Sequence, residues 1–140
     1  MTYLSPTKCL QTFGLPEKES SLTLFKVPTN LVVGNIPAKI YCNQRLVAPL
    51  TGFFRELVEK GLYTEITSWG GCFNNRGQRR DASKKSLHAW GCAIDMNAES
   101  MPLDAPNLWS PEFLAVAEKY FDWGGHWKNK DCMHFQLKDF

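Results

Sequence analysis

The chain has 140 residues, a formal net charge of +2 and 44% hydrophobic residues. This length predicts one domain that can bury a core without disulfides. Such a small positive charge does not by itself indicate nucleic-acid binding, so we expect no nucleic-acid partner. The five cysteines form no CxxC pair, which argues against a disulfide framework and an all-cysteine zinc site and favours buried, reduced thiols.

The first part of the chain differs in composition from the rest. Residues 1–27 are polar and interrupted by proline and glycine, which predicts an N-terminal arm, packed loosely if at all on a domain that spans residues 28–140. The arm has no basic start followed by a long apolar run. We therefore expect no secretory signal and no membrane insertion.

The remaining pattern predicts short strands and two main helices. Strands are expected over residues 22–28 and 38–43, a helix from about residue 47 to 61, and a strand over residues 63–69. A polar loop with four basic residues in its second half follows over residues 70–85. A buried strand is then expected over residues 90–97, a helix capped by Ser110 over 109–121, a turn over 122–127 and a closing strand over 132–137. This mixed order predicts an α+β fold in which a small antiparallel sheet packs with the two helices.

The segment SLHAWGCAIDMNA places His88 and Asp95 seven residues apart. In a straight strand this spacing separates them by roughly 23 Å, whereas the ligands of one zinc ion lie within a few Å of each other. Gly91 is the position at which the chain can fold back most easily. Taken alone, the pair is more typical of a surface histidine in a loop and of an aspartate that caps a turn with Asn97.

The C-terminal segment KDCMHFQL adds Asp131 and His134 in a second apolar setting. Two histidines and one carboxylate would give three protein ligands and leave a fourth position for water, as in catalytic zinc sites. Asp131 would then be a spare carboxylate that can act as a base on this water.

Both segments resemble motifs of the zinc D-alanyl-D-alanine carboxypeptidase family. SLHAWGCAIDMN fits the pattern S-x-H-x-x-G-x-A-x-D, and WGGHWKNKDCMHFQ fits W-G-G-x-W…D-x-M-H-F. The resemblance covers about residues 28–138 and implies the fold that this family shares with the hedgehog signalling domain. It also implies one zinc ion per chain, bound by His88, Asp95 and His134, with Asp131 as the catalytic acid and base.

The family has an arginine between its TSxxG strand and the first histidine. In ITSWGGCFNNR this is Arg76, which would stabilise the oxyanion, but the following loop aligns in more than one way and Arg79 and Arg80 are rivals. Arg79, Ser86 and His126 are the candidates for substrate binding. Arg79 and Arg80 are also compatible with a solvated charge run, and His126 with a simply exposed side chain.

Aromatic and sulfur-containing residues also flank the motifs. Four tryptophans are interpreted as core aromatics, of which one or two wall the cleft: Trp69, Trp90, Trp123 and Trp127. Cys92 and Cys132 are interpreted as packing residues of their motifs.

The resemblance implies a zinc metallopeptidase that hydrolyses peptidoglycan stem peptides, and the small members of the family include phage L-alanyl-D-glutamate endolysins. We expect a monomer that is made in the host cytoplasm and acts at the cell wall after release, as a free lysin or a virion-borne part. D-Alanyl-D-alanine carboxypeptidase activity is the alternative within the enzyme class. A non-catalytic zinc-containing module for wall binding or virion structure is the alternative outside it.

Overall fold

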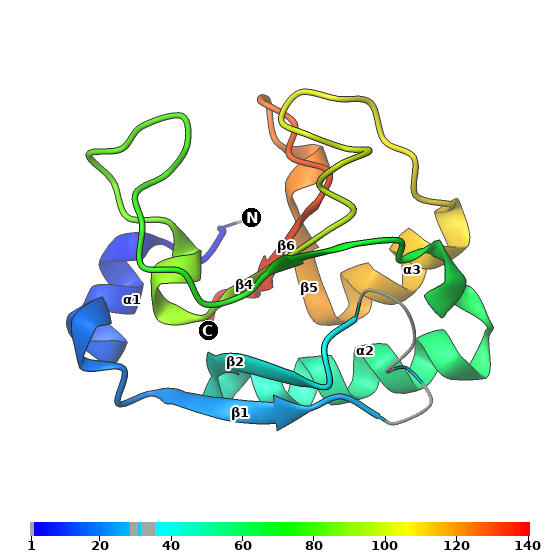
Figure 1. Ribbon diagram of the computed structural model, residues 1–140. Coiled ribbons are helices and arrows are strands. Elements are labelled where there is room, and N and C mark those ends of the chain that lie inside the picture. Colours follow the sequence, from blue (N-terminus) through cyan, green and yellow to red (C-terminus); the bar gives the residue numbers. More distant parts are fainter. Residues whose placement is uncertain (1, 29–30, 32–35) are drawn as a thin grey trace.

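The computed structural model describes residues 2–28, 31 and 36–140 (Figure 1). Within this part of the chain there are three α-helices, namely α1 (Pro6–Phe13), α2 (Val47–Glu59) and α3 (Pro111–Tyr120). The strands are β1 (Leu22–Lys26), β2 (Lys39–Asn43), β3 (Trp69–Gly71), β4 (Ala93–Met96), β5 (Phe121–Trp123) and β6 (His134–Leu137). They form two antiparallel sheets, one of β1 and β2 and one in the order β3-β4-β6-β5. The predicted α+β class is confirmed, although the strands are divided between two sheets and not united in one.

Helices α2 and α3 form as their sequences predict. Apolar residues at helical spacing on α2 include Phe53, which is fully buried and packs against Phe113 of α3 and Phe121 at ring-centroid distances of 5.9 and 5.3 Å. The Ser110 hydroxyl accepts a hydrogen bond from the Phe113 N–H at 3.1 Å and so caps α3. The two helices therefore pack against each other and against β5, beside the four-stranded sheet.

The strand predicted over residues 63–69 is wrong for most of its length. The chain forms a 3₁₀ turn over Leu62–Glu65 and joins the sheet only at its end. The Asn97 side-chain oxygen accepts hydrogen bonds from the Thr67 and Ser68 N–H groups at 2.8 and 3.2 Å. A side chain thus takes the backbone donors that a neighbouring strand would take in a regular ladder.

Other predicted boundaries shift where 3₁₀ turns replace strand or helix. The strand expected over residues 90–97 is limited to β4, and residues 87–90 form a 3₁₀ turn. The turn expected over residues 122–127 begins as part of β5 and continues as a 3₁₀ turn over Gly124–His126. Both differences lie at element ends, where local patterns discriminate least.

The N-terminal segment contains α1 and packs on the rest of the molecule. Leu4 and Cys9 are 3% and 0% exposed, and the Trp90 indole N–H donates to the Gly14 carbonyl at 2.9 Å. The helix begins at the Ser5 cap, whose hydroxyl accepts from the Lys8 N–H. A domain boundary at residue 28 stays a prediction.

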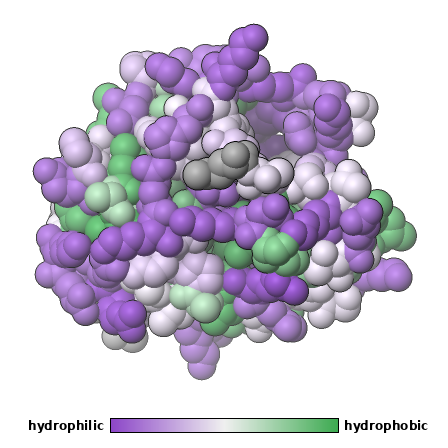
Figure 2. Space-filling model, turned by 180° about the vertical axis from the view of Figure 1, so that it is seen from behind, coloured by the Kyte–Doolittle hydropathy of each residue, from purple (hydrophilic) through white to green (hydrophobic). Residues whose placement is uncertain are grey.

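The five cysteines are free and buried, as predicted. Burial raises the pKa of the Cys42 thiol to about 11, so this group is uncharged at neutral pH. None of the helices in the described residues has the length and apolar character needed to cross a membrane. Hydrophilic residues predominate on the face seen in Figure 2, with hydrophobic residues in separate patches.

Candidate metal centre

Three buried side chains from three parts of the chain meet at one point. His88 lies on the 3₁₀ turn Leu87–Trp90, Asp95 on β4 and His134 on β6. The antiparallel pairing of β4 and β6 places Asp95 directly opposite His134. The turn then brings His88 back over β4 from seven residues upstream. The sequence-predicted trio is thus brought together by one strand pairing and one chain reversal.

Ser86 and Gly91 shape this chain reversal. The Ser86 hydroxyl accepts a hydrogen bond from the His88 N–H at 3.2 Å and caps the turn. Gly91 ends the turn in the left-handed conformation with φ +67°, and a Cβ there would lie 2.7 Å from the backbone nitrogen of Asn43. Both the conformation and the close approach of β2 require a glycine. The fold-back expected at Gly91 is present.

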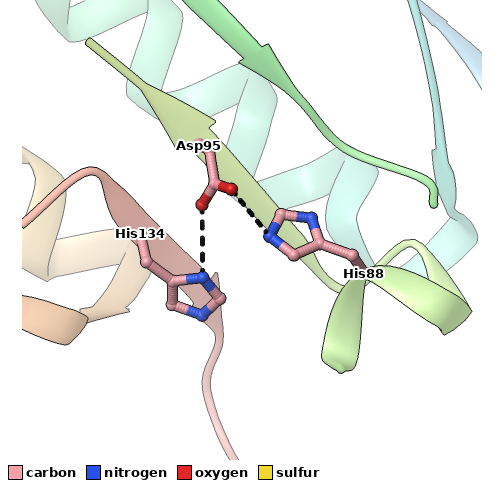
Figure 3. A group of neighbouring side chains, drawn as sticks. All are labelled: His88, Asp95 and His134. Atoms are coloured by element: carbon pink, nitrogen blue, oxygen red, sulfur yellow. Dashed lines mark ion pairs between the residues drawn. The ribbon is translucent and has the colours of Figure 1, made fainter. Parts of the chain in front are cut away.

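The three side chains have the chemistry and spacing of a zinc site (Figure 3). His88 Nε2 lies 3.1 Å from Asp95 Oδ2, and His134 Nδ1 lies 3.3 Å from Asp95 Oδ1. One ligand atom from each residue can be chosen so that all lie within 4.8 Å of one another. Two imidazole nitrogens and one carboxylate leave a tetrahedral zinc ion with one open position, which is the arrangement of catalytic sites.

Hydrogen bonds behind the imidazoles determine which nitrogen faces Asp95. His88 Nδ1 lies 2.7 Å from the Cys72 carbonyl oxygen, and His134 Nε2 lies 2.9 Å from the Gln136 side-chain oxygen. An oxygen of this kind only accepts, so each of these nitrogens carries the proton. In the neutral rings, the opposite nitrogens therefore present lone pairs to the Asp95 carboxylate.

The nitrogen lone pairs and the buried Asp95 carboxylate repel each other unless a positive charge lies between the nitrogens and the carboxylate oxygens. Burial would raise the pKa of Asp95, but protonated His134 and His88 rings would donate to its carboxylate and hold this pKa well below its ordinary value. Burial likewise would lower the pKa of His134, but Asp95 raises it. His88 Nε2 and Asp95 Oδ1 are buried without a hydrogen-bond partner. A divalent cation supplies the charge that this group of atoms needs, so the residues fit zinc.

Asp131 lines the same cavity as His88, Asp95 and His134 but is not one of the candidate metal ligands. Its Oδ1 is buried and has no hydrogen-bond partner. Burial is the main cause that raises the pKa of Asp131, and the negative charge of Asp95 adds to it, while His134 opposes the shift. A carboxylate with a raised pKa and an unpaired oxygen is suited to accept and return a proton.

A cavity of about 400 Å³ opens over the trio. Asp131, Arg76 and Arg79 are among the residues that line it.

The half-buried Arg76 donates to the Gly77 carbonyl at 3.0 Å, while its Nε is buried and unpaired. Burial lowers the pKa of Arg76, and the charge of Arg79 adds to this effect. Arg80 also lines the cavity, but both of its terminal nitrogens bind the Asp104 carboxylate at 3.0–3.1 Å. Among the three arginines, Arg76 is thus the least exposed, and it has a buried, unpaired donor.

The structure does not bring every sequence-predicted residue to the cavity. His126 is exposed, and its ring nitrogen pairs with Glu118 of α3. Ser86 lines the cavity, although its hydroxyl is used as the cap described above. Of the four tryptophans, Trp127 lines the cavity, with its ring centroid 5.0 Å from that of His134.

Sequence reasoning missed several cavity residues. Gln136 was predictable in principle, because side chains two apart on a strand share a face and His134 lies on the same strand. Tyr3, Leu4 and Pro6 carry no such signal, since only tertiary packing brings the N-terminal segment to the cavity.

Residues 79–137 match a family model described as D-alanyl-D-alanine carboxypeptidase. The resemblance drawn from the two motifs is confirmed over these residues, which include the predicted zinc ligands and Asp131 but not Arg76. At the level of the family, the match supports a zinc peptidase that acts on peptidoglycan. No curated protein and no solved structure matches the chain.

Proposed function

We propose that this protein is a zinc-dependent endopeptidase that cleaves peptidoglycan stem peptides at the L-alanyl-D-glutamate bond, as small phage endolysins do. One observation carries the proposal. His88, Asp95 and His134 direct their ligand atoms at one point, and the unpaired Asp131 carboxylate lies in the same cavity. Three ligands that leave one zinc position open, with a separate base nearby, are the usual arrangement of zinc enzymes that hydrolyse amides.

The residues of this chain would divide the reaction between them. A zinc ion held by the trio would supply a Lewis acid that acidifies water and polarises the scissile carbonyl. Asp131 accepts the proton of the attacking water and returns it to the leaving amine. Arg76 stabilises the charge that develops on the carbonyl oxygen, with a guanidinium that is half-buried and therefore poorly screened. The apolar walls of the cavity, including Leu4 and Met133, limit the access of bulk water.

The shape of the site favours an internal bond. A second cavity of about 610 Å³ shares Pro6 and Gln78 with the first, and Lys84 and Lys85 also line it. A peptide that continues beyond the scissile bond would pass these shared residues to reach the second cavity. D-Alanyl-D-alanine carboxypeptidase activity is the second candidate, because Arg76 and Arg79 on the wall of the first cavity can bind a terminal carboxylate.

A zinc-containing binding module is the alternative from outside the enzyme class. Asp131 argues against it, since a structural site does not require a buried, unpaired carboxylate beside the metal ligands. We also propose that the protein is a monomer, made in the host cytoplasm and active at the cell wall after release. These last proposals rest on the resemblance to small phage members of the family.

Purified peptidoglycan sacculi test the proposal directly. The protein is incubated with sacculi, with and without a chelator, and the soluble products are identified by mass spectrometry. Peptides that begin with D-glutamate support the proposed bond, and release of D-alanine alone identifies the carboxypeptidase. Zinc-loaded protein that releases nothing is the result expected of a binding module. The Asp131→Asn variant serves as the control for contaminating hydrolases.

A further inference from the structure

The N-terminal segment forms a wall of the cavity that contains the candidate metal centre. Tyr3, Leu4 and Pro6 line the same cavity as the zinc ligands, although more than 80 residues separate them along the chain. Leu4 is 3% exposed, whereas Tyr3 is 39% exposed. The segment thus has one side chain fixed in the core and its neighbour directed to solvent at the cavity.

Helix α1 holds this wall in place. Ser5, which lies between Leu4 and Pro6, caps the helix. Further along, Cys9 is fully buried, and the Gly14 carbonyl accepts a hydrogen bond from Trp90 on the turn that carries His88. Lys8 also pairs with Asp139 at 2.7 Å near the C-terminus. Because these contacts run from the N-cap to the C-cap of the helix, the position of the wall is defined by the same core as the metal centre.

A row of rings connects Tyr3 to the centre. The Tyr3 ring lies edge-on to Trp127, with centroids 6.1 Å apart and an interplanar angle of 70°. Trp127 in turn lies against the His134 imidazole, as described above. The Tyr3 ring is therefore one aromatic residue away from a zinc ligand.

We propose that Tyr3 is a specificity-determining residue, which packs against the bound stem peptide on the Trp127 side of the scissile bond. This inference rests on the proposed function and extends the substrate site to the N-terminal segment. Tyr3 lines the cavity but contributes little to the core, as its exposed fraction shows. Its ring offers a rigid apolar surface that loses little conformational freedom when a substrate binds.

Steady-state kinetics on a synthetic stem tetrapeptide test the role of Tyr3. We expect Tyr3→Ala to raise KM on the order of three- to tenfold, the loss of one aromatic contact. The value of kcat and the zinc content remain unchanged, because Tyr3 touches neither the metal ligands nor Asp131. Tyr3→Phe keeps the ring and restores the wild-type KM. Tyr41→Ala is the matched control, since Tyr41 is 37% exposed on β2 and does not line the cavity.

Distinct outcomes overturn the two levels of the inference. A KM for Tyr3→Ala equal to that of Tyr41→Ala, with hydrolysis by the wild type intact, overturns the role of Tyr3 alone. A fall in kcat or zinc content without a change in KM shows a merely structural role and also overturns it. If the zinc-loaded wild type hydrolyses no stem peptide, the proposed function fails and the assignment of Tyr3 fails with it. Should Tyr3→Ala unfold, Tyr3→Leu replaces it, because leucine keeps the apolar bulk without the ring. We expect the KM of Tyr3→Leu to lie above that of Tyr3→Phe. Equal KM values for these two variants overturn the proposal.

Discussion

Substitution of Gly91 by alanine separates the strain of a backbone conformation from the effect of a steric clash. Gly91 and Gly61 have the same φ of +67°, so a Cβ at either site is strained to a similar degree. A Cβ at Gly61 would meet nothing within 4 Å. A Cβ at Gly91 would lie 2.7 Å from the Asn43 nitrogen and 2.8 Å from a methyl group of Leu22. Gly91 ends the turn that carries His88, and Gly61 lies between the end of α2 and the next 3₁₀ turn, so both glycines adopt this conformation at helix ends.

The two substitutions should differ by the energy of the clash. The left-handed conformation costs about 1–2 kcal/mol for an alanine, and we expect Gly61→Ala to lower the free energy of unfolding by this amount. Overpacking of a tight site adds about 1–3 kcal/mol, so Gly91→Ala should be destabilised by about 2–5 kcal/mol in all. Backbone atoms of β2 form most of the obstacle, which limits relaxation. Relief of the clash should move the turn that carries His88, and zinc affinity should fall as well.

Urea unfolding of the metal-free protein measures the difference. A chelator is added because zinc bound to the native state would add its own linkage term. The free energies are compared by linear extrapolation, with the slopes checked for agreement between variants. Equal destabilisation by the two substitutions would refute the reasoning, because it would mean that the approach of β2 to Gly91 has no energetic effect. Zinc titration of the same samples shows whether the turn has moved.

Three further predictions address the centre and the helix pair. His134→Ala should lose the roughly one equivalent of zinc expected per chain, whereas Asp131→Asn should keep the metal and lose on the order of 10²–10⁴ in kcat; metal analysis and hydrolysis rates on the same preparations separate a ligand from a base. Arg76→Ala should lower kcat on the order of 10²–10³ with metal content intact, and loss of zinc in this variant would contradict a role in oxyanion binding. Glu56 of α2 accepts a hydrogen bond from Lys119 of α3 and another from the neighbouring tyrosine, which lowers the pKa of Glu56 from 4.5 to about 2. Since this pKa is lowered in the folded state, its stabilising contribution is complete above pH 4.5 and is lost as the pH falls towards 2. Urea midpoints are measured from about pH 6 to about pH 2, a range that includes both the ordinary and the lowered pKa of Glu56. Over this range the midpoint should vary less for Glu56→Gln than for the wild type. Identical pH profiles would disprove the linkage.

Local sequence determined much of the fold. Serine followed by proline defines the start of α3, and apolar residues at helical spacing define the buried face of α2. These signals extend over a few residues, so they can be recognised without knowing which distant segments pack against them. Gly91 was likewise the position at which the chain was expected to fold back if His88 and Asp95 bind one metal. The motif spacing also identified the candidate ligands, since the required residue types are rare in apolar segments.

Short helices and strands were harder to predict from the sequence. Helix α1 has eight residues and one buried side chain, Cys9, so its amphipathic pattern is too brief to stand out. The strand predicted over residues 63–69 failed because Asn97, 30 residues from Thr67, takes the backbone donors. A competing hydrogen bond from a distant side chain has no local signature.

Tertiary structure alone decided how the centre is assembled. The pairing of β4 with β6 places Asp95 beside His134, and the packing of α1 brings Tyr3 to the cavity. Neither contact follows from the order of residues, since each joins segments tens of residues apart through a shared core. The sequence by itself determined which side chains could bind a metal and where the chain could turn. The fold decided which nitrogen of each histidine faces Asp95, because that depends on carbonyl and amide oxygens fixed by distant backbone.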